Sequence, residues 1–410
     1  MNHELPAGIT IQPIDGGITA ADGFRVAAAS CGIKKADTLD FALIAADELA
    51  TATGVFTTNK AQAAPVLLSR EHLERSGGRV AAIIVNSGCA NACTGLDGLA
   101  VSRQSAEFVA ASIGCSPEHV LVASTGVIGV QLDLTKIQRG ATAALRSLSR
   151  ANHLGVARAI MTTDRAPKEA AVRIRTPAGS FHVGGMAKGA GMIEPNMATM
   201  LAFITTDAVV PPPTLQRALA TVIADTFNAI TIDGDTSTND SVFLMAGGAS
   251  KVSIDEALYP ALVAGLDHVC GALARAIVRG GEGVTKLVSI TVSRAATVDA
   301  ARHVAKVVAN SLLVKTAIHG GDPNWGRLVA AAGRAGVPFD IDRARVRVGP
   351  VVLFEDGVPF DHRAPEAAEY LQGSDIDIEI DLGTGGPHQA TVWTCDLSAE
   401  YVAINADYRT

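Results

Sequence analysis

Charge and aromatic side chains are both scarce in this 410-residue sequence. Charged residues make up 18% of it and aromatic residues 4%, and the net charge of −7 is spread without long blocks. Surfaces that bind nucleic acids need basic patches, often interleaved with aromatic side chains, and no such patch occurs. We therefore expect no nucleic-acid partner.

Long apolar runs are also missing, although apolar residues make up 48% of the chain. The compact runs Val80–Val85 and Met200–Ile204 are strand-sized and too short to cross a bilayer. The N-terminus lacks the basic region followed by an apolar core that a secretory signal needs. We therefore expect a cytoplasmic protein that does not associate with membranes.

Cysteine is rare and scattered. Of six cysteines, only Cys89 and Cys93 form a C-x-x-x-C pair, and no second pair or clustered histidine completes a zinc site. The acidic run 233–240 lacks the glutamate and the spacing of an EF-hand. Neither common nucleotide-binding loop is present, because the Gly189-Ala190-Gly191 run lacks a third glycine. We predict no metal, and thiols that are buried and reduced.

Glycine and alanine are abundant, and strand-like patterns alternate with helix-like ones. A chain of 410 residues exceeds one ordinary core, so two or more domains are expected. The pattern of apolar and polar residues changes near residue 286, and the chain after this point is predicted to form a smaller α+β unit. The patterns together predict a mixed α/β (α+β) chain built as a layered α/β sandwich.

Several local patterns predict specific elements. They are, in chain order, a strand at 81–85 with a turn at 86–88, a helix at 102–113 ending at Gly114, a hairpin from 172 to 183 that feeds a Gly184-Gly185 loop, a helix capped by Thr214, a strand at 288–292, a helix at 298–308, and strands at 346–354 and 376–382.

The most informative segment runs from Lys188 to Ala208 and reads KGAGMIEPNMATMLAFITTDA. Its spaced glycines and a proline shape a loop that ends at the strand-like run 200–204. Thr199 begins that strand beside the small Ala198, so its hydroxyl is presented rather than packed away. A threonine becomes an effective nucleophile when its own α-amine, freed by chain cleavage, acts as the base. Taken alone, such a loop is far more often ordinary architecture.

Three other positions carry groups suited to chemistry on an amino acid. Thr125 and Gly126 end a strand in a hydroxyl and a glycine, as an oxyanion hole requires, although a simple hydroxyl turn is the alternative. Glu282 lies between two glycines, and a carboxylate is the natural partner of an ammonium group. Lys188 could bind a carboxylate and lower the pKa of the Thr199 amine, although most lysines are solvated.

The 188–208 segment closely resembles the signature of the glutamate N-acetyltransferase/ornithine acetyltransferase family of arginine biosynthesis. The resemblance extends over nearly the whole chain, from Gly54 to the C-terminus. It implies self-cleavage at the Ala198–Thr199 bond, which would give pieces of 198 and 212 residues. It also implies an α/β/β/α-like sandwich assembled from both pieces. The expected division is 1–198, 199–286 and a smaller C-terminal domain, 287–410.

The resemblance also implies a role for individual residues. Thr199 is the nucleophile, and Thr125 and Gly126 form the oxyanion hole. The implied substrate-binding residues are Thr162, Lys188, Thr199, Glu282, Asn405 and Thr410. The runs 233–240 and 321–327 also occur in the family and are expected to shape the site.

The implied activity is transfer of an acetyl group from N-acetylornithine to glutamate, with no cofactor, because the acetyl group is carried by the protein. The motifs leave open whether acetyl-CoA is a second donor. The implied assembly is a heterotetramer of two α and two β chains. Two alternatives remain at this point: an N-terminal-nucleophile aminopeptidase of related fold, and an uncleaved, non-enzymatic binding protein.

Overall fold

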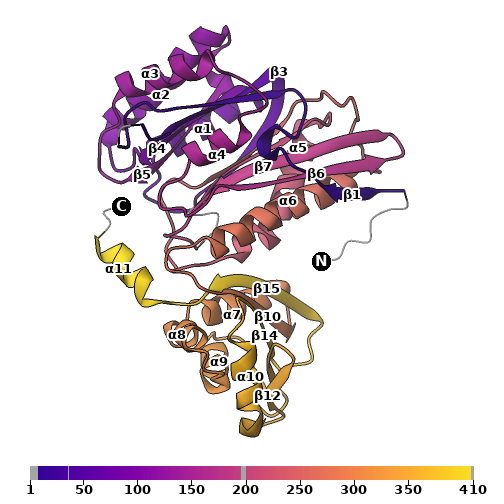
Figure 1. Ribbon diagram of the computed structural model, residues 1–410. Helices are drawn as coiled ribbons and strands as arrows, with labels where there is room; N and C mark the ends of the chain where they lie inside the picture. Colours follow the sequence, from indigo (N-terminus) through magenta and orange to yellow (C-terminus); the bar gives the residue numbers. More distant parts are fainter. Residues whose placement is uncertain (1–7, 36, 195–199, 408–410) are drawn as a thin grey trace.

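The computed structural model describes residues 8–35, 37–194 and 200–407, and within these ranges the chain forms a nine-stranded and a six-stranded sheet (Figure 1). The larger sheet has the order β1-β6-β7-β8-β9-β3-β4-β5, with β2 paired to β3. Its strands are β1 (Thr10–Pro13), β2 (Phe24–Ala29), β3 (Phe41–Phe56), β4 (Arg79–Cys89), β5 (Val120–Val127), β6 (Lys168–Thr176), β7 (Gly179–Lys188), β8 (Leu201–Thr206) and β9 (Ser241–Ala246). The helices around it are α1 (Ala64–Arg75), α2 (Gly95–Ile113), α3 (Leu134–Leu145), α4 (His153–Ala159), α5 (Pro212–Asp225) and α6 (Tyr259–Arg279).

The long strand β3 joins two halves of the larger sheet. Its first part pairs with β2 and β4, and its second part, from Thr51 to Phe56, pairs with β9. The two halves pack face to face, because one hydrophobic cluster contains Phe203 of β8 and Phe243 of β9 together with Ile83 of β4. The rings of Phe203 and Phe243 stack with their centroids 5.8 Å apart.

Helices cover the outer faces of both halves. Successive side chains of a strand point to opposite faces. Ala202 and Ile204 of β8 therefore point away from Phe203, into the cluster formed with α5 and α6. In the same way, Ile84 of β4 lies in the cluster formed with α2 and α3. The arrangement is an α/β/β/α sandwich, which confirms the predicted fold class.

The six-stranded sheet has the order β13-β12-β11-β14-β10-β15 and its own core. Its elements are β10 (Leu287–Ala295), β11 (Arg345–Val348), β12 (Val351–Glu355), β13 (Val358–Pro359), β14 (Asp375–Asp381), β15 (His388–Cys395), α7 (Val298–Ala309), α8 (Leu312–Gly320), α9 (Trp325–Gly333) and α10 (Ala364–Tyr370). The predicted helix at 298–308 is confirmed as α7, which begins after Thr297 because the Thr297 side chain accepts a hydrogen bond from the backbone N–H of Ala300. The last helix, α11 (Ala399–Asp407), lies apart from this sheet, toward the sandwich (Figure 1).

Two predicted turns are wrong because the strands continue. β4 runs through residues 86–88 to Cys89, since its parallel pairing with β5 continues to a bulge at Gly88 and Cys89. Gly184 and Gly185 lie inside β7 rather than in a loop. A β-carbon at Gly184 would come within 2.1 Å of the Gly17 carbonyl oxygen, so close approach of the backbone explains this glycine.

Two element boundaries also differ from prediction. α5 begins at Pro212, so Pro211 rather than Thr214 occupies the N-cap. The predicted strand 346–354 is a hairpin of β11 and β12, which turns at Gly349 with φ 55°. The helix end at Gly114 is confirmed, since that residue has φ 75°.

Helix α6 corrects the expectation that no segment is long enough to cross a membrane. It has 21 residues and a mean hydropathy of 1.6, and it is the one helix in the described part of the chain that meets the length and composition criteria. However, 67% of its apolar stretch is buried inside the protein. Leu266 and Leu273 pack in the cluster beneath β6 and β7, so the composition reflects a core layer of the sandwich.

Candidate active site

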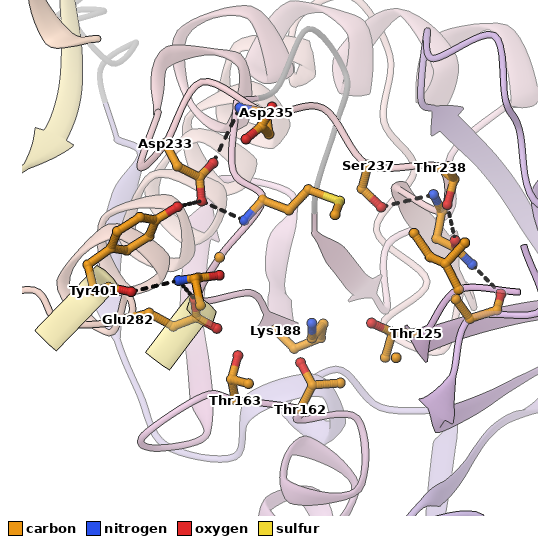
Figure 2. Close-up of a pocket in the computed structure, with 17 residues that line it drawn as sticks. Thr125, Thr162, Thr163, Lys188, Asp233, Asp235, Ser237, Thr238, Glu282 and Tyr401 are labelled. Carbon is orange, nitrogen blue, oxygen red and sulfur yellow. Dashed lines mark hydrogen bonds between the residues drawn. The ribbon is translucent and has the colours of Figure 1, made fainter. Parts of the chain in front are cut away.

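A polar cavity of about 230 Å³ lies where the sandwich meets α11. It brings together the predicted site residues that the structure describes, namely Thr125, Gly126, Thr162, Lys188, Glu282 and Asn405. Figure 2 shows Lys188, Thr162 and Glu282 around this cavity. The remaining predicted residues, Ala198, Thr199 and Thr410, lie outside the described residues.

The Thr125-Gly126 pair lies near the end of β5, where the strand meets the bulge of β4. Gly126 has φ 132°, and a β-carbon there would come within 2.3 Å of the Gly88 carbonyl carbon. Only glycine fits this position, because its backbone must approach another backbone. The amide of Asn239 donates to the carbonyl oxygens of Ala90 at 2.6 Å and Ser124 at 2.9 Å, and so ties this strand to the 233–240 run.

Lys188 is the last residue of β7 and is buried at the cavity wall. Its register partner on β8 is Leu201, the second residue after Thr199 in the sequence. Burial lowers the pKa of Lys188, and the nearby carboxylate of Asp164 opposes that shift. The side chain is therefore desolvated, not the solvated loop lysine that was the alternative.

Asp164 is a buried acceptor that the sequence did not single out. Its carboxylate accepts from the backbone N–H groups of Thr162 at 3.0 Å and Gly189 at 2.8 Å, and from the ammonium of Lys168 at 2.5 Å. Burial alone would raise the pKa of Asp164, but the charges of Lys188 and Lys168 and these hydrogen bonds lower it to about 2. The sequence clue was its place two residues after Thr162.

Glu282 is held between the loop after β7 and helix α11. Its backbone N–H donates to the Ala190 carbonyl at 2.8 Å, and its carboxylate accepts from the side-chain amide of Asn405 at 2.9 Å. Next to it, the Ser398 hydroxyl donates to the Gly283 carbonyl at 2.6 Å and fastens the start of α11. The structure thus pairs two predicted substrate-binding residues, Glu282 and Asn405, whose contact the sequence did not predict.

Asp233 and Tyr401 line the same cavity, and the sequence did not identify Tyr401. The Tyr401 hydroxyl donates to Asp233 at 3.2 Å (Figure 2). The Asp233 carboxylate also accepts from the N–H groups of Met192 at 2.7 Å and Ile193 at 2.8 Å. Burial raises the pKa of Asp233, and these two backbone bonds oppose the shift. Tyr401 and Asn405 are four residues apart on α11, a spacing that places them on one helix face and could have revealed Tyr401.

Of the two polar runs expected to shape the site, only the first does so. Five residues of the 233–240 run line the cavity: Asp233, Asp235, Ser237, Thr238 and Asn239. The 321–327 run does not contribute to the cavity lining within the described chain, so that expectation is wrong. Its Asn324 caps α9 by accepting from the Arg327 N–H, and Trp325 stacks on Phe354 of the six-stranded sheet.

One group of metal-ligand side chains occurs elsewhere, among Asp22, His182 and Asp207, whose ligand atoms lie within 4.8 Å of one another. The Asp207 carboxylate already accepts from the His182 ring at 2.7 Å and from the His182 backbone N–H at 2.7 Å. Asp22 pairs with Arg150. These contacts account for the cluster without an ion, and the absence of a metal stays a prediction.

The cavity can bind a small zwitterion. Its lining includes a buried ammonium, that of Lys188, and carboxylates, among them Glu282 and Asp233. Thr125 and Gly126 line the same cavity, so hydrogen-bond donors of the kind that an oxyanion hole needs lie at its wall. The arrangement suits acyl chemistry on an amino acid.

Comparison with known proteins supports this reading. The ArgJ family profile matches residues 25–410. The arginine biosynthesis bifunctional protein ArgJ of Thermosynechococcus vestitus is 46% identical, over 97% of this chain and 99% of the relative. That of Dehalococcoides mccartyi is 47% identical, over 99% of this chain and all of the relative. A solved arginine biosynthesis bifunctional protein from Bacillus halodurans is 40% identical with a TM-score of 0.50, over 51% of this chain and all of the solved chain. The chain therefore belongs to the ArgJ family.

Proposed function

We propose that this enzyme transfers the acetyl group of N-acetylornithine to glutamate through an acetyl ester on Thr199. The observation that carries the proposal is the convergence of Thr125, Gly126, Thr162, Lys188, Glu282 and Asn405 on one cavity from separate parts of the chain. Membership of a family of bifunctional arginine biosynthesis proteins supports the same acyltransferase activity.

The first half-reaction forms the ester. The Thr199 hydroxyl attacks the acetyl carbonyl and passes its proton to the Thr199 α-amine. The Thr125 hydroxyl and the Gly126 N–H stabilise the resulting oxyanion. Collapse of this intermediate breaks the bond between the acetyl carbon and the α-nitrogen, and the protonated α-amine returns its proton to the departing ornithine.

The second half-reaction reverses these roles. The α-amine of glutamate attacks the ester carbonyl, the same oxyanion hole stabilises the charge, and the Thr199 oxygen leaves and regains a proton. Lys188 provides a cation for a substrate carboxylate, and Glu282 provides a carboxylate for a substrate ammonium. We also assign Thr162, Asn405 and Thr410 to substrate binding. No cofactor is needed for this cycle.

The nucleophile requires prior cleavage at Ala198–Thr199, which would divide the chain near its middle. The solved chain from Bacillus halodurans is matched over its whole length by 51% of this chain, as expected for one piece of a relative that is cut near its middle. We retain the division into 1–198, 199–286 and 287–410, an assembly of two α and two β chains, and a cytoplasmic location. Use of acetyl-CoA as a second donor belongs to the same proposal.

The test is to incubate the mature protein with N-acetylornithine and glutamate and to measure N-acetylglutamate. With N-acetylornithine alone, one acetyl mass should appear on the C-terminal fragment and none on the N-terminal one. Release of free acetate instead of N-acetylglutamate would indicate a hydrolase, such as the aminopeptidase that the family match does not favour. Initial-rate lines that intersect, together with an unlabelled C-terminal fragment, would rule out the covalent mechanism.

A further inference from the structure

Asp164 has no part in the chemistry proposed above, yet it contacts the residues that do. Its side chain is fully buried, with 0% exposed. One carboxylate oxygen accepts from the backbone of Thr162, and the other accepts from the backbone of Gly189, which directly follows Lys188. A single carboxylate therefore fixes two proposed substrate-binding segments against each other.

The partner cation of Asp164 extends this cluster to a third segment. The side chain of Lys168 is 4% exposed and donates to Asp164. It also packs beneath Gly280, where a β-carbon would lie 3.1 Å from the Lys168 Cε atom. Gly280 begins the loop that carries Glu282, so the cluster contacts all three of the segments that present Thr162, Lys188 and Glu282.

The amino groups in this cluster outnumber its carboxylate. Two lysines, Lys168 and Lys188, are buried together with the single carboxylate of Asp164. Buried charges are costly unless they are paired. Besides burial, three carboxylates favour the charged form of Lys188, namely Asp164, Asp240 and Glu282. Two amino groups, those of Lys168 and Lys34, oppose it. Asp164 is the strongest of the favourable charges.

We propose that Asp164 is a positioning residue for acetyl transfer, which holds Lys188 beside Thr162 and keeps a positive charge at the cavity wall for the carboxylate of the amino-acid substrate. The inference rests on the proposed function, because it needs Lys188 to bind substrate. Asp164 acts through Lys188 and does not touch the substrate itself.

The test compares the pH dependence of kcat/KM for N-acetylornithine in the wild type and in two variants. If the Lys188 ammonium binds the substrate carboxylate, the basic limb of the profile reports loss of its proton in the free enzyme. Asp164→Asn keeps the shape of the side chain but removes its charge, so the basic limb should move to lower pH. Lys168→Met removes the repelling cation, so the limb should move to higher pH. A shift of one pH unit changes kcat/KM about tenfold above the limb, and the change should appear in KM rather than kcat.

Opposite shifts in the two variants support the inference, because general damage to the site would move both variants in the same direction. Unchanged limbs in both variants would overturn it, as would a loss of kcat at constant KM. If Asp164→Asn does not fold or mature, the pH profile of Lys168→Met alone provides the test, because Lys188 in that variant still has Asp164 as its partner. Failure of the proposed function is recognised separately, because the wild type would then form no N-acetylglutamate.

Discussion

A β-carbon on Gly191 would lie 2.5 Å from a carboxylate oxygen of Glu282, so the missing side chain of one residue makes room for the charge of the other. Glu282 is only 6% exposed, and its carboxylate is oriented by the Asn405 amide at 2.9 Å. The carboxylate is thus held in place at the cavity wall before any substrate arrives.

Glu282→Ala should raise the KM for the amino-acid substrates and leave self-cleavage nearly normal. Loss of the charged partner of a bound ammonium costs about 2–5 kcal/mol. Gly191→Ala should raise KM by less, because the Glu282 side chain can shift away from the added methyl group. Gly320→Ala, which has no atom within 4 Å of the new β-carbon, is the matched control. A Glu282→Ala protein that stays uncleaved but binds substrate normally would instead place Glu282 in the cleavage step.

Thr199→Ala should leave the 410-residue precursor intact, because no hydroxyl remains to attack the Ala198 carbonyl. A denaturing gel should show one band for this variant and two bands of similar size for the wild type. N-terminal sequencing of the smaller wild-type pieces should find one that begins Thr-Met-Leu-Ala-Phe. A mature fragment that begins elsewhere would contradict the assignment of the nucleophile.

Thr125→Val should reduce turnover roughly 10²–10³-fold, as the loss of one oxyanion donor does in other enzymes. It should also slow maturation, because the same hole would first stabilise the Ala198 carbonyl. Thr163→Val is the control, since Thr163 lines the same cavity but has no role in the proposed chemistry. Equal losses of turnover in the two variants would argue against an oxyanion role for Thr125.

Gly126→Ala should lower the melting temperature far more than Gly129→Ala. Both glycines have positive φ, 132° and 79°, so an alanine is strained at either position. The conformational strain alone costs about 1–2 kcal/mol. At Gly126 the methyl group would also meet backbone atoms of Gly88 and Cys89, whereas at Gly129 no atom lies within 4 Å. Equal melting temperatures would show that the β4–β5 contact is looser than described.

Asp164 should make the stability of the protein depend on acid pH. Its pKa is about 2 in the folded protein, below its ordinary value of 3.8, so the unfolded chain binds the proton more tightly. The resulting stabilisation, about 2 kcal/mol, is present above pH 4 and is lost as the pH falls from 4 toward 2. In urea unfolding, the stability difference between the wild type and Asp164→Asn should therefore shrink below pH 4. A difference that stays constant from pH 6 to pH 2.5 would contradict the assigned pKa.

The local sequence determined much of the architecture and suggested the reactive groups that we propose. The compact apolar run 200–204 marked β8, a strand buried on both faces, and the helical periodicity at 298–308 marked α7. The unusual residues of the 188–208 segment, and the Thr125-Gly126 and Glu282 motifs, pointed to the chemistry because their types and order are specific.

The tertiary structure alone decided what surrounds those groups. Gly184 was predicted to lie in a loop, but it lies within β7, where it pairs with Ala171 of β6 and Thr205 of β8. Contacts with residues distant in the sequence explain the importance of three side chains, those of Asp164, Asp233 and Tyr401. The hydrogen bond between Tyr401 and Asp233 spans 168 residues of sequence. Burial and long-range hydrogen bonds assign such roles, and neither is encoded in the spacing of residues along the chain. The sequence singled out the side chains that we propose to react, whereas the fold set the position and the surroundings of those that the structure describes.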